Sequence, residues 1–478
     1  MARVSNRFHP FFRLSPAEQI DARCFGVEQG KIRQRADVNF WRITPFLEER
    51  FSRALFPLSR FGELAVTVQY GCSELAKLEP LGVPILRMNN LQNDGWDLSN
   101  LKYIELTENQ LDTYKLNVGD IIFNRTNSKE LVGKCEVFRE TGDWVFASYL
   151  IRVRTDEIRL NPQFASDFLS TFTGRLQIDR FSRQIIGMTN INAEEIRQIL
   201  IPIPPLQRQI ELVFAMDEAR SQRKQKLAEA DALLSSLDDY LINALGLDRP
   251  VKDERNVFAI QTSNVSGRFD PHFHAPNFKR IYQLLSQIVT KPLGEIAKFS
   301  KDSWNPAHEE KSTFRYIEIS NVKPQTGEAL WTETLTKEAP SRARMLVKDD
   351  DIIVSLTRPH HGSIAHLSTE FDNCVASTGF AVIRSVSELV NREYLWCILR
   401  SQLSLQQMLQ RSSGGNYPAI TKAELENIII PIPEMDLQEN IVTEVERRRA
   451  EAQRLRSEAE TGWQEAKQWF EEQLLGVG

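Results

Sequence analysis

The sequence predicts an α+β fold, in which two duplicated mixed α/β domains are separated by two long antiparallel, coiled-coil-like helices. Three observations support this prediction. The word IPIP occurs at 201–204 and again at 430–433, each time followed by a Leu-Gln-x-x-Ile segment. Other matches keep their order along the chain, beginning with SRFGELA (59–65) and TKPLGEIA (290–297). After each Pro word, a stretch without proline carries apolar residues at helical spacing.

Length and composition limit the classes of protein to consider. The chain has 478 residues, of which 41% are hydrophobic, so it exceeds one ordinary domain and can bury sizeable cores. No run of about 18 apolar residues occurs, so we expect no membrane-spanning helix and no membrane partner. The N-terminal residues lack the apolar region of a secretory signal. Five scattered cysteines without a C-x-x-C pair indicate buried free thiols and a cytoplasmic location.

The net charge of −5 is unevenly distributed. Residues 205–245 contain 5 basic and 7 acidic side chains, a net −2, and residues 434–475 contain 6 and 11, a net −5. The remainder of the chain therefore carries about +2. A field this weak does not decide for or against a DNA-binding surface.

The repeat divides the chain into four segments. We predict a first domain at 1–204, with an N-terminal arm of about residues 1–30 that has no counterpart in the second half. A central spacer helix follows at 205–246, then a second domain at 247–433 and a C-terminal spacer helix at 434–478.

The apolar residues of the two spacer segments recur every three or four positions, as in a coiled-coil seam. Each helix would be about 60 Å long at 1.5 Å per residue. An apolar stripe of that length needs a cover, and the other helix is the simplest one. The predicted helix-pair and partner interface comprises Leu227, Leu234, Leu237, Leu241, Leu455, Trp463, Phe470 and Leu474.

Each domain contains a short apolar run, DIIFNR (120–125) or DIIVSL (351–356), that predicts a buried strand entered from a turn. The segment LVKDDDIIV, which contains the start of the second run, lacks the glycine of its counterpart LNVGDIIF. The Pro words read as extended segments that lead into a helix, because proline is tolerated at a helix start. The second word is followed by Glu-Met-Asp where the first has one proline, which we interpret as a two-residue insertion.

The words IPIPPLQRQI and IPIPEMDLQENI, with GDIIFNR and DDIIVSL upstream, resemble those of specificity (S) subunits of type I restriction–modification systems. The resemblance covers nearly the whole chain, apart from about the first 25 residues. It implies that each domain is a target-recognition domain that reads one half of a split DNA site. Because the two domains differ in sequence, we expect the site to be asymmetric.

The same resemblance implies partners. The helices would set the spacer between the half-sites and dock two methyltransferase (M) subunits, and restriction/translocase (R) subunits would join the complex. The chain itself would do no chemistry and bind no cofactor or metal. Adenine-N6 methylation and DNA cleavage would come from the partners, with S-adenosylmethionine bound by the methyltransferase.

Loops at strand ends are the expected sites of DNA contact, since loops carry function on rigid scaffolds. Arg and Lys suit guanine, Asn and Gln suit adenine, and hydroxyl and main-chain N–H groups suit phosphate. In the first domain the predicted DNA-binding residues are Arg87, Asn89, Asn90, Asn124, Arg125, Thr126, Asn127, Lys129, Gly187 and Asn190. In the second they are Ser320, Asn321, Lys323, Ser355, Thr357, Arg358, His360, His361, Gly415, Asn416 and Tyr417. For each residue alone, a solvated turn is an equally good interpretation.

Catalytic motifs are weak. Asn161-Pro162-Gln163-Phe164 comes near the N-P-P-[FY] motif of adenine methyltransferases, but we interpret Asn161 as a helix N-cap. Asp302, Glu309 and Lys311 imitate a nuclease site only loosely and suit a solvated loop better. The histidines lack Cys or acidic partners at ligand spacing, so a zinc site is not expected.

Two alternatives to a restriction S subunit remain open. One is an S-like subunit of a methylation-only or related phage-defence system, which differs only in its partners. The other is a coiled-coil protein-interaction scaffold, which explains the helices but not the polar loops at matched strand ends.

Overall fold

The computed structural model describes residues 37–92, 95–129, 131–185, 188–248, 257–260 and 270–476. The chain forms two compact units. The first contains Met1–Leu227 together with Ser457–Gly478, and the second is the continuous stretch Ala228–Arg456. The predicted N-terminal arm lies outside the described residues. Within the described residues, no helix is long and apolar enough to cross a membrane.

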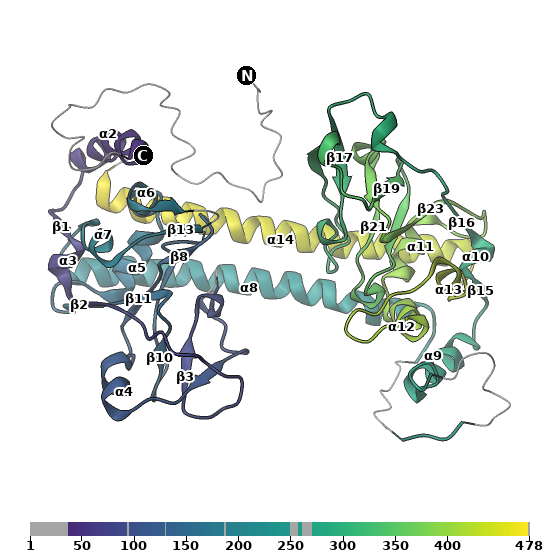
Figure 1. The fold of residues 1–478 in the computed structure, drawn as a ribbon, viewed down its shortest axis with the longest axis horizontal. Helices are drawn as coiled ribbons and strands as arrows, with labels where there is room; N and C mark the ends of the chain where they lie inside the picture. The colour runs from purple at the N-terminus through teal and green to yellow at the C-terminus, as the bar shows by residue number, and fades with distance from the viewer. Residues whose placement is uncertain are drawn as a thin grey trace. The chain divides into compact units, whose positions relative to one another are not determined.

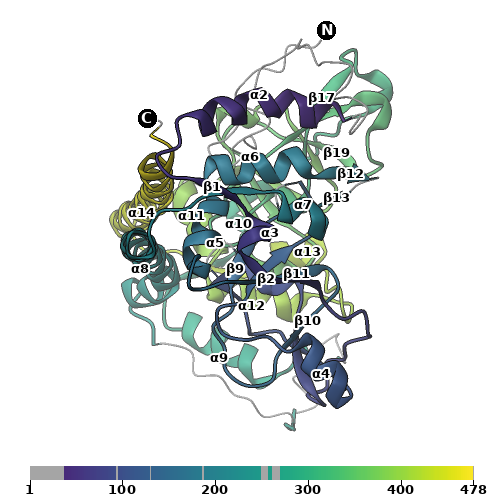
Figure 2. The ribbon, with the colours of Figure 1, turned by 90° about the vertical axis from the view of Figure 1, so that its left-hand side faces the viewer.

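The first unit is built on an antiparallel sheet with the strand order β2-β11-β7-β9. A second sheet has the order β10-β3-β6. Helix α2 lies beside α6 (Figure 2), and Ile43 and Leu47 of α2 pack with Leu176 of α6. The elements are α2 (Val38–Ser52), β1 (Leu58–Arg60), α3 (Phe61–Leu64), β2 (Ala65–Tyr70), β3 (Val83–Leu86), η2 (Met88–Asn90), β4 (Leu91–Gln92), β5 (Gly95–Trp96), β6 (Lys102–Ile104), α4 (Glu108–Tyr114), β7 (Ile121–Asn124), β8 (Thr126–Asn127), β9 (Cys135–Val137), β10 (Val145–Phe146), β11 (Leu150–Thr155), α5 (Pro162–Ser170), α6 (Phe172–Phe181), β12 (Arg183–Ile185), β13 (Met188–Asn190), α7 (Ala193–Arg197) and β14 (Leu200–Pro202).

The second unit repeats this plan, with a main sheet in the order β16-β23-β20-β21 and a second sheet in the order β18-β17-β22-β19 (Figure 1). The elements are α9 (Pro276–Leu285), β15 (Thr290–Pro292), α10 (Leu293–Ile296), β16 (Ala297–Phe299), η4 (Pro306–His308), β17 (Thr313–Ile317), η5 (Ile319–Asn321), β18 (Thr332–Leu335), η6 (Thr336–Glu338), β19 (Ala343–Leu346), β20 (Ile352–Ser355), η7 (Pro359–His361), β21 (Ile364–His366), η8 (Thr369–Phe371), β22 (Val375–Ser377), β23 (Phe380–Val386), α11 (Arg392–Leu399), α12 (Gln402–Arg411), α13 (Lys422–Glu426) and β24 (Ile429–Pro431). The duplication predicted from the sequence is therefore confirmed.

The continuous apolar runs at 121–123 and 352–354 arise because β7 and β20 are buried on both faces. Successive residues of a strand point to opposite sides of its sheet. Ile121 and Phe123 therefore pack in one core with helix α5, whereas Ile122 packs in a separate core with β3 and β10. In β20, Ile352 and Ile353 divide between two cores in the same way. The prediction of two buried strands is confirmed.

Each Pro word forms a short strand inside its own domain. β14 pairs antiparallel with β1, and β24 pairs antiparallel with β15. A buried glutamine holds each of these strands by its main chain. Gln177 accepts a hydrogen bond from the N–H of Leu200 at 2.8 Å and donates to its carbonyl at 2.9 Å. Gln407 makes the same two bonds to Ile429, at 2.8 and 2.9 Å.

A second buried glutamine joins each domain to the spacer helix that follows it. Gln209 accepts from the N–H of Asn161 at 2.8 Å and donates to the carbonyls of Arg159 and Pro204. Gln438 accepts from the N–H of Asn391 at 2.9 Å and donates to the carbonyls of Leu389 and Pro433.

These equivalences correct the predicted two-residue insertion. Gln209 and Gln438 both lie five residues beyond the last proline of the IPIP word, and the helices begin at Leu206 and Met435, also at equal distance from it. The prediction of an insertion was wrong because it matched the Leu-Gln pair at 206–207 with the Leu-Gln pair at 437–438. That alignment places the exposed Gln207 opposite the buried Gln438.

The two spacer helices are α8 (Leu206–Ala244), with 39 residues, and α14 (Met435–Leu475), with 41 residues. In the first unit Lys226 pairs with Glu458 at 3.0 Å. In the second unit Asp231 pairs with Arg456, and Ser236 accepts a hydrogen bond from Arg448. As the residue numbers rise along α8 they fall along α14, so the helices are antiparallel, as predicted.

The apolar stripe of these helices is covered only partly by the other helix. Leu234 packs with Ala230, Ala452 and Leu455 in a small cluster between α8 and α14, and Leu227 is half-buried. The remaining stripe residues pack into the domain cores. In the second unit these are Leu237 and Leu241, and in the first unit they are Trp463, Phe470 and Leu474.

The end of each spacer helix also caps a helix of the domain it packs against. Glu471 of α14 accepts a hydrogen bond from the N–H of Thr173, in the first turn of α6, at 2.7 Å. Asp238 of α8 accepts from the N–H of Gln402, at the start of α12, also at 2.7 Å. Each domain is thus completed by the helix that comes from the other copy.

Candidate nucleic-acid interface

The first domain gathers its three predicted DNA-binding stretches at one edge of the main sheet. At this edge β2 and β7 end and β11 begins. The strand β8 follows β7 and pairs with β13, with Thr126 opposite Asn190. The amide of Asn127 lies 3.6 Å from the Sδ atom of Met88, which belongs to the stretch 87–90. We call the residues 87–90, 124–129 and 188–190 the first loop edge.

The second domain forms a matching edge, where β20 ends and β23 begins. The N–H of Leu356 donates to the carbonyl of Gly379 at 2.7 Å, and Thr357 pairs with Ala419 across an antiparallel bridge. The stretch 319–323 is also close to this edge. A Cβ atom on Gly379 would lie 2.7 Å from the Cδ1 atom of Ile319. We call the residues 319–323, 355–361 and 415–419 the second loop edge.

Several predicted contact residues have side chains that hold the loops themselves. Asn90 is 2% exposed, and its side-chain oxygen accepts from the N–H of Arg87, three residues earlier, at 3.0 Å. Asn321 caps the same turn in the second domain by accepting from the N–H of Glu318 at 2.8 Å. Asn124 and Ser355, at equivalent strand ends, are buried and bond to the main chain of their own loops.

The remaining predicted residues differ in exposure. Thr126 is buried in β8. Gly187 lies outside the described residues. The half-buried side chains are those of Arg87, Asn127, Arg125, Lys129, Asn190, Asn321, Lys323, Thr357, Arg358 and His360. The exposed residues are Asn89, Ser320, His361, Gly415, Asn416 and Tyr417.

Two arginines of these edges lie over tyrosine rings. The guanidinium carbon of Arg125 is 4.8 Å from the ring centre of Tyr70, and that of Arg358 is 4.2 Å from the ring centre of Tyr417. Among the described residues, no carboxylate forms an ion pair with either arginine. Lys323, in contrast, is paired with Glu328 at 2.9 Å.

Sequence reasoning missed two tyrosines that lie next to the first loop edge. Tyr70 ends β2, and Tyr149, which is 52% exposed, accepts the main-chain hydrogen bond of Arg125 through its carbonyl. Their distance from Arg125 along the chain hides this contact. The only available signal was an aromatic residue at the end of a predicted strand.

The histidines of the second loop edge are close together. The rings of His360 and His361 are 4.6 Å apart. Burial lowers the pKa of His360, and the neighbouring His361 and Arg358 lower it further. At neutral pH His360 is therefore an uncharged donor or acceptor.

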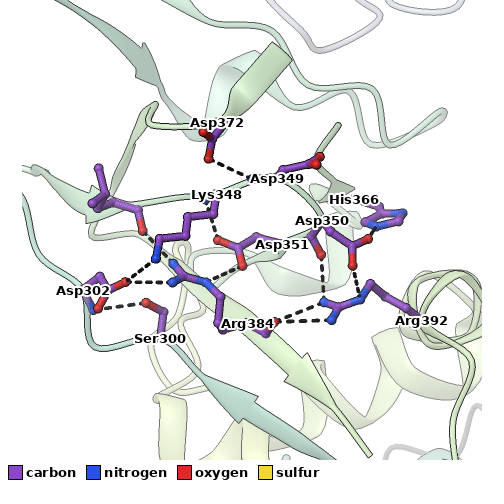
Figure 3. Close-up of polar contacts among 11 residues, drawn as sticks. Ser300, Asp302, Lys348, Asp349, Asp350, Asp351, His366, Asp372, Arg384 and Arg392 are labelled. Atoms are coloured by element: carbon purple, nitrogen blue, oxygen red, sulfur yellow. Dashed lines mark hydrogen bonds and ion pairs between the residues drawn. The ribbon is translucent and has the colours of Figure 1, made fainter. Parts of the chain in front are cut away.

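The residues considered for catalysis have structural roles. Asn161 caps α5 by accepting from the N–H groups of Gln163 and Phe164, as predicted, and Asn391 caps α11. Asp302 pairs with Arg384 at 2.7 Å, as Figure 3 shows. Glu309 instead accepts from the indole N–H of Trp304 at 2.8 Å. In the described parts of the chain, no group of three or more His, Cys, Asp or Glu residues is arranged to hold a metal ion.

Comparison with known proteins gives one family. The model of the type I restriction modification DNA specificity domain matches residues 72–229 and again 286–450, which together make up more than half of the chain. The first match contains the first loop edge, and the second match contains the second loop edge. Both matches extend into a spacer helix.

Individual relatives agree with this match. The chain is 21% identical to a protein named as the type I restriction enzyme MjaX specificity subunit of Methanocaldococcus jannaschii, over 79% of this chain and 83% of that protein. It is 24% identical to the EcoKI specificity subunit of Escherichia coli strain K12, over 41% of this chain and 42% of that one.

Solved structures give weaker similarity. A chain from work on complex assembly and conformational transition of the type I R-M system has a TM-score of 0.48 at 15% identity, covering 87% of this chain and 95% of that one. The S subunit from M. genitalium has a TM-score of 0.40 at 14% identity, covering 89% and 97%.

Proposed function

The chain belongs to the family of type I restriction modification DNA specificity domains, and contains two of them; from this we propose that each domain reads one half of a bipartite, asymmetric DNA site. The chain is the specificity subunit, and its domains bring sequence recognition to the complex. The adenine methylation and the DNA cleavage belong to partner subunits.

The observation that carries this proposal is the matched position of the two loop edges. Each lies at the same edge of an equivalent sheet, where the equivalent strands β7 and β20 end. Polar and cationic side chains project from rigid strands there, which is the arrangement that base-edge readout needs.

The differences between the edges support an asymmetric site. The first edge presents Arg125, Asn127 and Lys129, whereas the second presents Arg358, His361 and Tyr417. Different donors and acceptors select different bases, so the two half-sites have different sequences. A symmetric homodimer would instead favour a palindrome.

Two methyltransferase subunits and, in a restricting complex, translocase subunits are the proposed protein partners. The exposed faces of α8 and α14 and the adjoining domain surfaces are their proposed docking region. S-adenosylmethionine belongs to the methyltransferase, where the target adenine is flipped out of the duplex, because a stacked base is out of reach.

The test is to express this chain with the methyltransferase subunit from the same locus in a host without adenine methylation, and to sequence the modified adenines across the genome. We expect one bipartite motif with unlike halves and a constant gap. Methylation without a sequence motif, or an identical motif when this chain is omitted, would contradict the proposal. A chain that binds the methyltransferase but leaves the genome unmodified would favour a scaffold.

A further inference from the structure

The two loop edges share a feature that assigns a base to each half-site. We propose that Arg125 and Arg358 each read a guanine through a guanidinium group that is held in place by a tyrosine ring. This inference rests on the proposed function and adds to it that each half of the target contains a guanine.

A tyrosine ring over each guanidinium does not use its N–H donors. The group is planar, and a ring against one face restricts its tilt while its N–H donors remain in the plane. A guanine presents O6 and N7 in the major groove, and a guanidinium can bond both at once. The rings of Tyr70 and Tyr417 thus preorganise the two arginines for bidentate contact.

Each of these arginines is also oriented by one main-chain carbonyl. A terminal nitrogen of Arg358 donates to the carbonyl of Asn416 at 3.2 Å, and one of Arg125 donates to that of Ser148 at 3.4 Å. The second terminal nitrogen of each has no protein acceptor among the described residues. One contact fixes the direction of the side chain, and the second terminal nitrogen remains for a ligand, although the Nε atom of Arg125 is buried.

Arginines with a structural role look different in the same domains. Arg400 also lies beside an aromatic ring, that of Trp396, but its two terminal nitrogens donate to three carbonyls, those of Ile364, Pro324 and Gln325. Arg384 is paired with Asp351 and Asp302. Both terminal nitrogens of Arg400 and Arg384 are used within the protein, whereas Arg125 and Arg358 each keep one terminal nitrogen without a protein acceptor among the described residues.

The two arginine–tyrosine pairs do not occupy equivalent positions of the duplication. In the strand register Ile121 corresponds to Ile352, so the counterpart of Arg125 is Leu356 and that of Arg358 is Asn127. The tyrosines also come from different places, since Tyr70 ends β2 and Tyr417 precedes β24. The same arrangement is therefore built from non-equivalent positions in the two domains, which favours a shared function.

Backbone conformation adds a further observation in the second domain. Arg358 has φ 48°, in the left-handed region, which is uncommon for a residue other than glycine. Strain of this kind collects at binding sites. Here it turns the chain so that the N–H of Arg358 bonds the carbonyl of Pro418 and its side chain reaches Tyr417.

The test uses the full chain with its methyltransferase partner and maps modified adenines for the unmodified chain, Arg125→Gln, Arg358→Gly and Tyr417→Phe. Glycine suits the left-handed backbone at 358, so Arg358→Gly removes the side chain without adding strain. We expect Arg358→Gly to reduce discrimination for guanine at one position by about tenfold to a hundredfold, while the other half-site stays unchanged. Arg125→Gln should do the same in the other half, and Tyr417→Phe should preserve the motif because its ring remains.

A matched control is Arg315→Gln. Arg315 lies over Trp331, but its terminal nitrogens donate to the carbonyls of Glu370 and Asp372. We expect this change to leave the motif as it is.

Four outcomes would overturn the inference. A motif with no guanine in one half contradicts it directly, and an unchanged motif in both arginine variants refutes base reading while the proposed function stands. An equal loss of methylation at all sites would mean that the arginines bind phosphate. If the unmodified chain directs no motif at all, the proposed function fails first, and this inference fails with it.

Discussion

At the scale of single residues, a buried aspartate is repeated at the entrance to the central strand of each domain. Asp120 accepts from the N–H of Asn117 at 2.8 Å and pairs with Arg154 at 2.7 Å. Asp351 accepts from the N–H of Lys348 at 2.8 Å and pairs with Arg384 at 2.6 Å (Figure 3). Each aspartate closes the turn and joins it to the neighbouring strand.

The residue before each aspartate shows how one turn tolerates two sequences. Gly119 has φ 95° and Asp350 has φ 67°, so both are left-handed, although only the first is a glycine. The carboxylate of Asp350 lies 2.7 Å from His366 and 2.8 Å from Arg392 (Figure 3). The ion pair with Arg392 and the contact with His366 compensate in part for the strain of a side chain in this conformation.

We predict that Asp350→Gly leaves the stability of the second domain nearly unchanged. The variant loses a partly exposed ion pair with Arg392, which is worth up to about 1 kcal/mol, and the contact with His366, and it gains an unstrained left-handed residue. Asp350→Ala loses the same pairs but keeps the strain, so it should be less stable than the glycine variant by about 1 kcal/mol. Thermal unfolding of the two variants compares them, and equal melting temperatures would refute the argument from strain.

At the scale of elements, the Pro words serve as junctions between a domain and its spacer helix. The buried Gln209 and Gln438 each make three hydrogen bonds across the junction, to the N-cap of α5 or α11 and to two carbonyls. The strand before each junction pairs within the domain, and the start of the helix is hydrogen-bonded to the same domain. Together these contacts set the direction in which the helix leaves the domain.

We predict that Gln209→Leu destabilises the first unit by about 2–4 kcal/mol, because three main-chain groups lose their hydrogen bonds to a buried side chain. Gln207→Leu is the matched control, since Gln207 is exposed and should tolerate the same change within about 0.5 kcal/mol. Denaturant unfolding of both variants measures the difference. If Gln207→Leu proved the more damaging, the equivalence of Gln209 and Gln438 would be refuted.

At the scale of the whole molecule, the two compact units differ in continuity. The second is one stretch, Ala228–Arg456, whereas the first needs the C-terminal segment Ser457–Gly478. Phe470 and Leu474 are fully buried in the first unit, and Glu471 caps α6 there. The last turns of α14 are therefore part of the first domain's core.

We predict that a fragment of residues 228–456 folds by itself and that residues 1–227 do not. The N-terminal fragment would expose the apolar surface around Phe164 that Phe470 covers. Adding a peptide of residues 457–478 should restore its structure, and the same peptide with Phe470→Asp should not. Circular dichroism and limited proteolysis measure folding, and a stable 1–227 fragment without the peptide would refute the prediction.

The sequence by itself determined the duplication, the buried strands and the antiparallel spacer helices, because these depend on local periodicity and on repeated words. It also identified Asn161 as a helix cap, since capping is decided within a few residues. Only the tertiary structure decided that Gln209, not Gln207, matches Gln438, that Tyr70 supports Arg125, and that Phe470 belongs to the first domain. Those contacts join residues far apart in the chain, and no local pattern of hydrophobicity or charge specifies which distant partners will meet.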